Sequence, residues 1–197
     1  PGGDLSDPVV QATLREVRVF WGLDAKLAYA RHFPAINWLN SYSLYADVMD
    51  NYYKKEVSGK WIHNRQAALR ILQEEADLEE IVRLVGIDAL SPKDRLTLEV
   101  ARSIREDFLH QNAFHEIDTY TSLEKQFYML EAILLFYNLA LDSVKEDIPL
   151  DLILEHEVRE EIARMKYHPE IEIEKIKAVQ DSIRKAFEEI KTRRASA

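Results

Sequence analysis

The hydrophobic positions of the chain follow two periods, and the change between them falls near residue 41. Val17, Val19, Trp21 and Leu23 alternate with their neighbours, and this period of two predicts a strand over residues 16–23. It is the single strand that the pattern predicts. Because one strand leaves its backbone donors and acceptors unpaired, we expect the rest of its sheet to lie upstream. A helical interpretation of this segment stays open.

Two short helices are predicted around that strand. Asp7 followed by Pro8 is a typical helix start, and the helix is expected to run to about Leu14. Asp24 is placed to cap a second helix that ends near Arg31. Pro34 follows, and a proline keeps the residue before it out of the helical region.

From about residue 41 onward the apolar residues recur three or four apart, which predicts helices. The groups are Leu44, Val48 and Tyr52; Ile62, Leu69, Leu72 and Ala76; Leu78, Ile81, Val82 and Val85 after a restart at Asp77; Leu96, Leu98, Val100, Ile104, Phe108 and Leu109; Phe127, Leu130, Ile133, Leu134, Tyr137 and Leu141; Val158, Ile162 and Met165; and Ile176, Val179, Ile183, Phe187 and Ile190. A short helix is expected after Pro149. Most of the chain is therefore predicted to be an α-helical bundle.

Capping signals mark several helix ends in this part. Ser91 to Asp94 forms one capping box, and Thr121 with Glu124 is predicted to form another. Gly86 is expected to end a helix in the left-handed conformation. Residues 110–120, between the two boxed helices, are predicted to be a loop, and loops held by rigid helices often carry function.

Composition and charge narrow the classes of function. The chain has 197 residues, no cysteine and a formal net charge of −9. The negative charge argues against a nucleic-acid partner, and the lack of cysteine excludes disulfides and thiolate ligands. No uninterrupted apolar run approaches the roughly 18 residues that span a bilayer, so no direct membrane insertion is expected. The start, Pro1-Gly2-Gly3, is not a signal peptide and lacks a Met, which suggests a piece of a longer chain.

Motifs for chemistry are missing from the sequence. Gly59-Lys60 is followed by Trp61, so no phosphate-binding loop is formed, and no dinucleotide or nucleophile-elbow motif occurs. His110 and His115 are five residues apart, which does not place them on one helical face, and no metal site is predicted. Acidic pairs such as Glu74-Glu75 are expected on solvated helix faces. No catalytic residue is predicted.

Three stretches resemble the catalytic subunit of the V- and A-type rotary ATP synthases. They are Pro1–Val9 running into Gln11–Leu14; Arg31–Tyr45, with its Phe33-Pro34-Ala35; and Leu96–Asp118, especially Arg105–Phe108, Gln111 and Ala113-Phe114. The second stretch is the most specific. Phe33 stands where F-type relatives have Tyr, which favours the V/A branch.

The resemblance implies an adenine pocket and a rotor contact. In that family the aromatic before Pro-Ala and the aromatic of the Gln-x-Ala-Phe loop sandwich the adenine ring, which implies Phe33 and Phe114 here. Pro34, Gln111, Asn112 and Ala113 would complete the pocket, although relatives often carry Asp at position 112, which leaves the role of Asn112 open. The segment Asp88, Ala89, Leu90, Ser91, Pro92, Lys93 and Asp94 corresponds to an acidic, rotor-pressing loop of F-type β-subunits. It is less acidic here, so contact by shape is expected, and an ordinary capped turn stays the alternative.

The resemblance also predicts the fold and the setting of the chain. The fold is expected to be mainly α, a C-terminal helical bundle (45–197) preceded by the last strand and helices of a RecA-like α/β nucleotide-binding domain (1–44). The full subunit would bind ATP or ADP with Mg²⁺, alternate with the non-catalytic, B-type subunit in a hexamer, contact the central stalk rotor, and lie in the cytoplasm, peripheral to the membrane. The isolated chain is expected to be inactive and without cofactor. The non-catalytic subunit of the same complex and a free-standing helical adaptor are the alternatives.

Overall fold

The computed structural model describes residues 6–195, so Pro1–Leu5 of the first resembling stretch lie outside the described residues. The N-terminal part contains α1 (Pro8–Glu16), β1 (Val19–Leu23), α2 (Ala25–Tyr29) and β2 (Ile36–Ser43). Both predicted helix starts are confirmed. The Asp7 carboxylate accepts the amide of Val9 at 2.8 Å, and that of Asp24 accepts the amide of Lys26 at 2.8 Å.

The strand prediction is only partly correct. β1 pairs with β2 in an antiparallel arrangement, Val19 opposite Ser43 and Leu23 opposite Ile36, so one partner strand lies within this chain. Further strands of this sheet upstream stay a prediction. The sequence missed β2 because Asn37, Asn40 and Ser41 are poor strand formers and its burial does not alternate. A bulge lies between Phe20 and Gly22.

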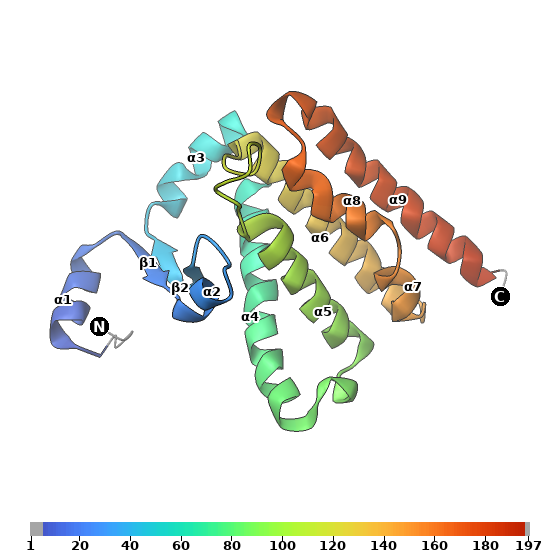
Figure 1. Cartoon of the computed structure of the whole chain (residues 1–197), viewed down its shortest axis with the longest axis horizontal. Helices are drawn as coiled ribbons and strands as arrows, with labels where there is room; N and C mark the ends of the chain where they lie inside the picture. The colour runs from blue at the N-terminus through green and yellow to red at the C-terminus, as the bar shows by residue number, and fades with distance from the viewer. Residues whose placement is uncertain (1–5, 196–197) are drawn as a thin grey trace.

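The rest of the chain is helical, as the sequence predicts, and the mainly α fold is confirmed. Its elements are α3 (Ala46–Glu56), α4 (Trp61–Val85), η1 (Ile87–Ala89), α5 (Pro92–Ser103), η2 (Ile104–Leu109), α6 (Leu123–Lys145), α7 (Leu150–Leu154), α8 (Val158–Arg164), η3 (Met165–Tyr167), η4 (Glu170–Glu172) and α9 (Ile173–Ala195). Figure 1 shows α4 and α5 as an antiparallel hairpin. The two strands lie beside α4, and α9 lies along α6 on the other side of the molecule.

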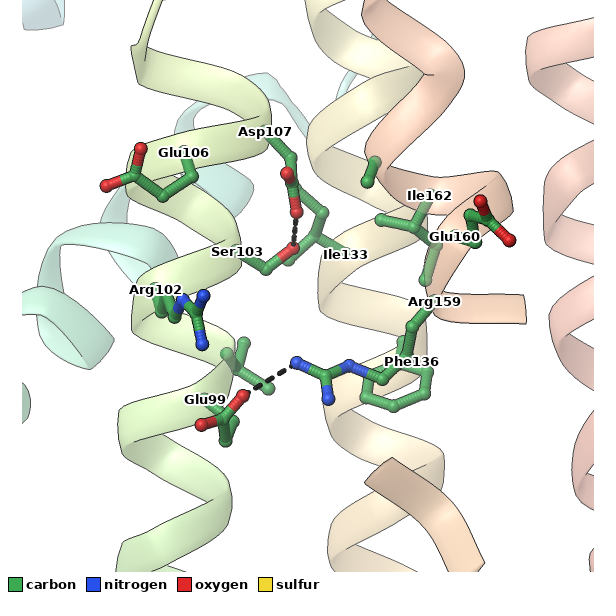
Figure 2. A pocket seen from close by; sticks show the side chains of 12 residues that line it. Glu99, Arg102, Ser103, Glu106, Asp107, Ile133, Phe136, Arg159, Glu160 and Ile162 are labelled. Atoms are coloured by element: carbon green, nitrogen blue, oxygen red, sulfur yellow. Dashed lines mark hydrogen bonds and ion pairs between the residues drawn. The ribbon is translucent and has the colours of Figure 1, made fainter. Parts of the chain in front are cut away.

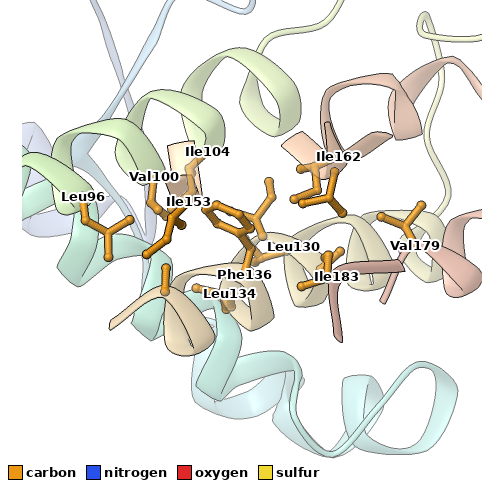
Figure 3. Packing of buried hydrophobic residues seen from close by; sticks show 14 of the residues in the cluster. Leu96, Val100, Ile104, Leu130, Leu134, Phe136, Ile153, Ile162, Val179 and Ile183 are labelled. Atoms are coloured by element: carbon orange, nitrogen blue, oxygen red, sulfur yellow. The ribbon is translucent and has the colours of Figure 1, made fainter. Parts of the chain in front are cut away.

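The core is formed where α5, α6 and α9 meet, with α7 and α8 closing it. Figure 3 shows Leu96, Val100 and Ile104 of the α5–η2 segment beside Leu130 and Phe136 of α6 and Ile183 of α9. Leu96, Ile104 and Ile183 are completely buried. The i, i+4 spacing of Leu96, Val100 and Ile104 therefore forms one inward-facing stripe.

α6 is the described helix whose length and composition would also suit a membrane span, with a mean hydropathy of 1.4 over the qualifying stretch. Half of that stretch is buried inside the protein. The helix contacts α4, α5, α8 and α9, so its apolar residues are those of a central core helix.

Three details at the helix ends differ from the sequence predictions. α4 continues through Asp77, whose exposed carboxylate accepts a bond from Gln73 on the same helix face. Gly86 has a positive φ of 87° but an extended ψ of 161°, so it ends α4 without the left-handed cap. Ser122, rather than Thr121, caps α6 by accepting the amide of Lys125 at 3.1 Å. Ser91 caps α5 as predicted: its hydroxyl accepts the amide of Asp94 at 3.2 Å and donates to the Asp94 carboxylate at 2.7 Å.

Candidate functional site

Two segments far apart in sequence, around Phe33 and around His110, are joined by hydrogen bonds beside the end of η2. The backbone amide of Phe33 donates to Nδ1 of His110 at 3.2 Å, and the amide of Gln111 donates to the carbonyl of Phe33 at 2.7 Å. The His32 ring bonds the carbonyl of Arg105 through Nε2 at 2.9 Å. The segment before β2 is thus fixed against the start of the 110–120 loop.

The predicted aromatic pair lies on this junction with both rings accessible. Phe33, which precedes Pro34 through a cis peptide, is 50% exposed, and Phe114 is 99% exposed. No ring contact joins them among the described residues. The structure therefore places the loop of Phe114 beside Phe33 and leaves the two aromatic faces open.

The 110–120 loop is held mainly by bonds within itself. The Gln111 amide group donates to the carbonyl of Asp118 at 3.3 Å, and the amide of Asn112 donates to the Asp118 carboxylate at 2.8 Å. The side-chain oxygen of Asn112 accepts the amide of Phe114 at 3.0 Å, a local turn that fixes the backbone of Ala113 and Phe114.

The buried Lys166 bonds the start of the loop, and the buried Lys125 of α6 holds the segment that carries Lys166. Nζ of Lys166 donates to the carbonyls of Glu106 at 2.9 Å and His110 at 3.0 Å, and lies 3.9 Å from the Asp118 carboxylate. Nζ of Lys125 donates to the carbonyls of Lys166 at 2.9 Å and His168 at 2.7 Å. Each cation is satisfied by backbone oxygens, as a buried charge requires.

The surroundings of His110 favour its neutral form. Burial lowers the pKa of His110, and the nearby positive charge of Lys166 lowers it further. A neutral imidazole is what the bond from Phe33 requires, because only an unprotonated Nδ1 accepts. Burial also lowers the pKa of Lys125.

Glu75, expected on a solvated face, is instead buried at 6% exposure. The Arg105 guanidinium binds it through Nε at 3.1 Å and through a terminal nitrogen at 2.9 Å. Burial raises the pKa of Glu75, and Arg105 opposes that rise. The prediction of a solvated Glu75 was wrong because its burial depends on which face of α4 packs against η2. The sequence of the acidic pair alone does not show which face that is.

Sequence reasoning missed Lys166, Lys125, Asp118 and His110 as parts of this junction. Lys166 is separated from the loop by more than forty residues, and lysine is usually a solvated residue. The one sign in the sequence that Lys166 is buried comes from its immediate neighbours. Lys166 lies between Met165 and Tyr167 in an otherwise apolar turn, which is an unusual place for a cation.

The predicted rotor segment lies elsewhere. Residues 88–94 cover the end of the connection between α4 and α5 and the first turn of α5, at the opposite end of that hairpin from the 110–120 loop (Figure 1). Exposed apolar side chains gather just before it: Ile81 at 46%, Leu84 at 83%, Val85 at 62% and Ile87 at 52%. The structure therefore does not bring the two predicted sites together.

A hollow of about 390 Å³ between α5 and α8 holds charged groups of both signs. Figure 2 shows Arg159 reaching Glu99, at 2.7 Å, and Ser103 donating to Asp107 at 2.6 Å. Burial raises the pKa of Asp107. Arg159 with Glu99 and Ser103 with Asp107 satisfy one another in these pairs, so we assign no chemistry to this hollow.

Comparisons with known proteins agree over nearly the whole chain. Residues 50–154 match the model of the C-terminal domain of V and A type ATP synthase, and residues 1–43 match the nucleotide-binding domain of the ATP synthase alpha/beta family. The V-type ATP synthase alpha chain of Thermoanaerobacter pseudethanolicus is 61% identical over 95% of this chain, and that of Clostridium novyi is 58% identical over 96%.

A solved structure has a similar fold, and this chain covers only part of the length of its relatives. The ATP synthase subunit NeqB from Nanoarcheaum equitans matches 68% of this chain and 31% of its own, with a TM-score of 0.55 and 25% identity. This chain spans 32% of the length of both alpha chains named above.

Proposed function

The chain belongs to the V- and A-type ATP synthase family, and we propose that it forms the adenine-recognition part of a catalytic alpha chain. The whole subunit would couple ATP synthesis or hydrolysis to ion movement. Residues 1–44 would complete the nucleotide-binding domain, and residues 45–197 would form the helical domain.

The bonded junction of Phe33 with the 110–114 loop carries this proposal. A purine is a flat π-system, and two accessible aromatic faces on one junction suit stacking of such a ring. Pro34 sets the approach of Phe33, and the small side chain of Ala113 leaves room beside Phe114. Gln111 and Asn112, already used within the loop, act mainly by shaping it.

In this proposal the chain recognises the base but does not perform the chemistry. Phosphate contacts and Mg²⁺ dominate both the hold on a nucleotide and catalysis in such sites. No group of three His, Asp or Glu side chains among the described residues is placed to hold a metal ion. In the proposal, Mg²⁺ and the phosphates are held by other parts of the full-length protein, and we expect this chain alone to be inactive.

We assign the rotor contact to residues 88–94 together with the exposed apolar residues at the end of α4. A projecting hairpin end with Leu84 and Ile87 exposed suits contact by shape with an apolar partner. The partners in this proposal are the non-catalytic, B-type subunit, which would alternate with this one in a hexamer, and the central stalk. The assembly would lie in the cytoplasm, peripheral to the membrane.

Substitution of each aromatic residue in the full subunit tests the adenine assignment. Phe33→Ala and Phe114→Ala should each weaken ATP binding by about fivefold to hundredfold, the range expected for loss of a base–aromatic stack. Binding of inorganic tripolyphosphate should not change. Tyr120→Ala, which removes another exposed aromatic residue from the same loop, is the matched control. Unchanged ATP affinity in both phenylalanine variants would refute the assignment.

A further inference from the structure

The ammonium group of Lys166 lies where η2 ends and the 110–120 loop begins. It bonds the carbonyls of Glu106 and His110, which lie on either side of the end of η2. Glu106 lies in the last turn of the π-helix η2 and His110 follows its end, where helix carbonyls lack an intrahelical partner. Lys166 supplies donors to these carbonyls, and its side chain is only 7% exposed.

The same ammonium group also faces the other end of the loop. Asp118, with a side chain 2% exposed, lies 3.9 Å from it and accepts the amide of Asn112. Lys166 therefore contacts both ends of the segment that carries Phe114. Its neighbour Tyr167 packs against His115 of this loop, with ring centroids 4.9 Å apart.

We propose that Lys166 is a positioning residue for base recognition, holding the 110–114 loop so that Phe114 and Phe33 face the same ligand. The proposal rests on the adenine assignment above. It adds that the segment after α8, beyond the matched range of the C-terminal domain model, fixes the selectivity of the site. The ligand class is a nucleotide bound through its purine, with the phosphates held elsewhere.

Loss of the ammonium group should affect binding of the base rather than turnover. Without Lys166, two carbonyls and the Asp118 carboxylate lose their cation in a buried setting, and the loop must open to hydrate them. Phosphate contacts do not depend on this loop in our proposal. A variant that loses only the contacts of Lys166 with the loop should have a higher KM for ATP and a nearly unchanged kcat.

The test is Lys166→Met in the assembled, full-length enzyme, because Met keeps the length of the side chain and removes its donors. KM for ATP should rise by about tenfold, with kcat within about twofold of the parent. The inhibition constant of inorganic tripolyphosphate should not change. Lys177→Met removes a lysine near the start of α9, bound to exposed carboxylates, and should change none of these values.

Hydrogen exchange separates a moved loop from a misfolded protein. In Lys166→Met the amides of residues 111–114 should exchange faster while those of α6 stay protected. Exchange that is also faster in α6, or a tripolyphosphate constant that rises with KM, would overturn the positioning role in favour of general destabilisation. An unchanged KM would overturn it as well.

The two proposals fail in different ways. If Phe33→Ala and Phe114→Ala weaken ATP binding but Lys166→Met does not, the adenine assignment stands and the role of Lys166 is wrong. If the phenylalanine variants have no effect, the adenine assignment fails, and faster exchange of the loop in Lys166→Met would then report only on loop structure.

Discussion

At the scale of single residues, His110 makes the junction between Phe33 and the loop sensitive to pH. Its Nδ1 accepts the amide of Phe33 only when it carries no proton. Burial and the charges of Lys166 and His32 lower its pKa, and Glu106 and Asp118 oppose this. The junction is therefore fully formed above the ordinary histidine pKa of about 6.5 and weakens on acidification.

The expected outcome is a loss of stability on the acid side. The unfolded chain takes up a proton near pH 6.5, and the folded chain takes it up at a lower pH. The contribution of His110 to the free energy of unfolding is therefore lost as the pH falls from about 6.5 through the folded value. His110→Asn keeps an acceptor that does not titrate. Urea unfolding of the parent and of His110→Asn between pH 5 and 7 checks this. If the free energy of unfolding changes equally with pH in the two proteins, the prediction is wrong.

Residues whose structural role is local were predictable from the sequence. Asp7, Asp24 and Ser91 cap helices because a cap acts on amides two or three residues away. The burial of Glu75 and Lys166 was not predictable, because their partners come from distant segments. Phe33 and Phe114 were named by resemblance, and their role in binding stays a prediction.

At the scale of elements, the Arg105–Glu75 pair ties η2 to the middle of α4. Arg105→Met would leave a carboxylate at 8% side-chain exposure without its partner, which typically costs about 3–5 kcal/mol. Arg105→Met with Glu75→Met should recover most of that loss. Arg164→Met, which breaks an exposed pair with Glu160, should cost less than about 1 kcal/mol.

Urea unfolding of the four proteins measures these differences. If Arg105→Met and Arg164→Met prove equally mild, the buried pair does not stabilise the contact between η2 and α4. The prediction concerns stability alone, since neither side chain contacts Phe33 or the 110–114 loop through an identified bond.

Element types were predicted better than element boundaries. The longer helices α4, α5, α6 and α9 follow from apolar spacing, since each buries one face. α3 shows the same spacing but has no buried residue. The π-helical turn of η2 is hidden, because residues 92–109 carry one continuous helical pattern. β2 is hidden as well, since its polar residues lack a period and its pairing with β1 comes from the tertiary fold.

At the scale of the whole molecule, the proposed base site and the proposed rotor contact lie at opposite ends of the α4–α5 hairpin. Leu84→Ser with Ile87→Ser should barely affect stability, because both side chains are mostly exposed. In the assembled enzyme the pair should lower ion movement per ATP hydrolysed while ATP affinity stays unchanged.

Parallel measurement of hydrolysis and ion uptake in vesicles checks this prediction. Leu152→Ser with Ile171→Ser, which removes two exposed apolar residues away from the hairpin end, is the matched control. If ion movement per ATP hydrolysed is the same in both double variants, the rotor assignment is wrong.

The position of Lys166 has a consequence for how the protein is made. Phe33 and Phe114 leave the ribosome before Lys166, since synthesis runs from the N-terminus. The nascent chain therefore carries both aromatic residues before Lys166, the donor to the carbonyls of Glu106 and His110, has been made. A nascent subunit would thus acquire its full preference for the purine only when the segment after α8 emerges, late in translation.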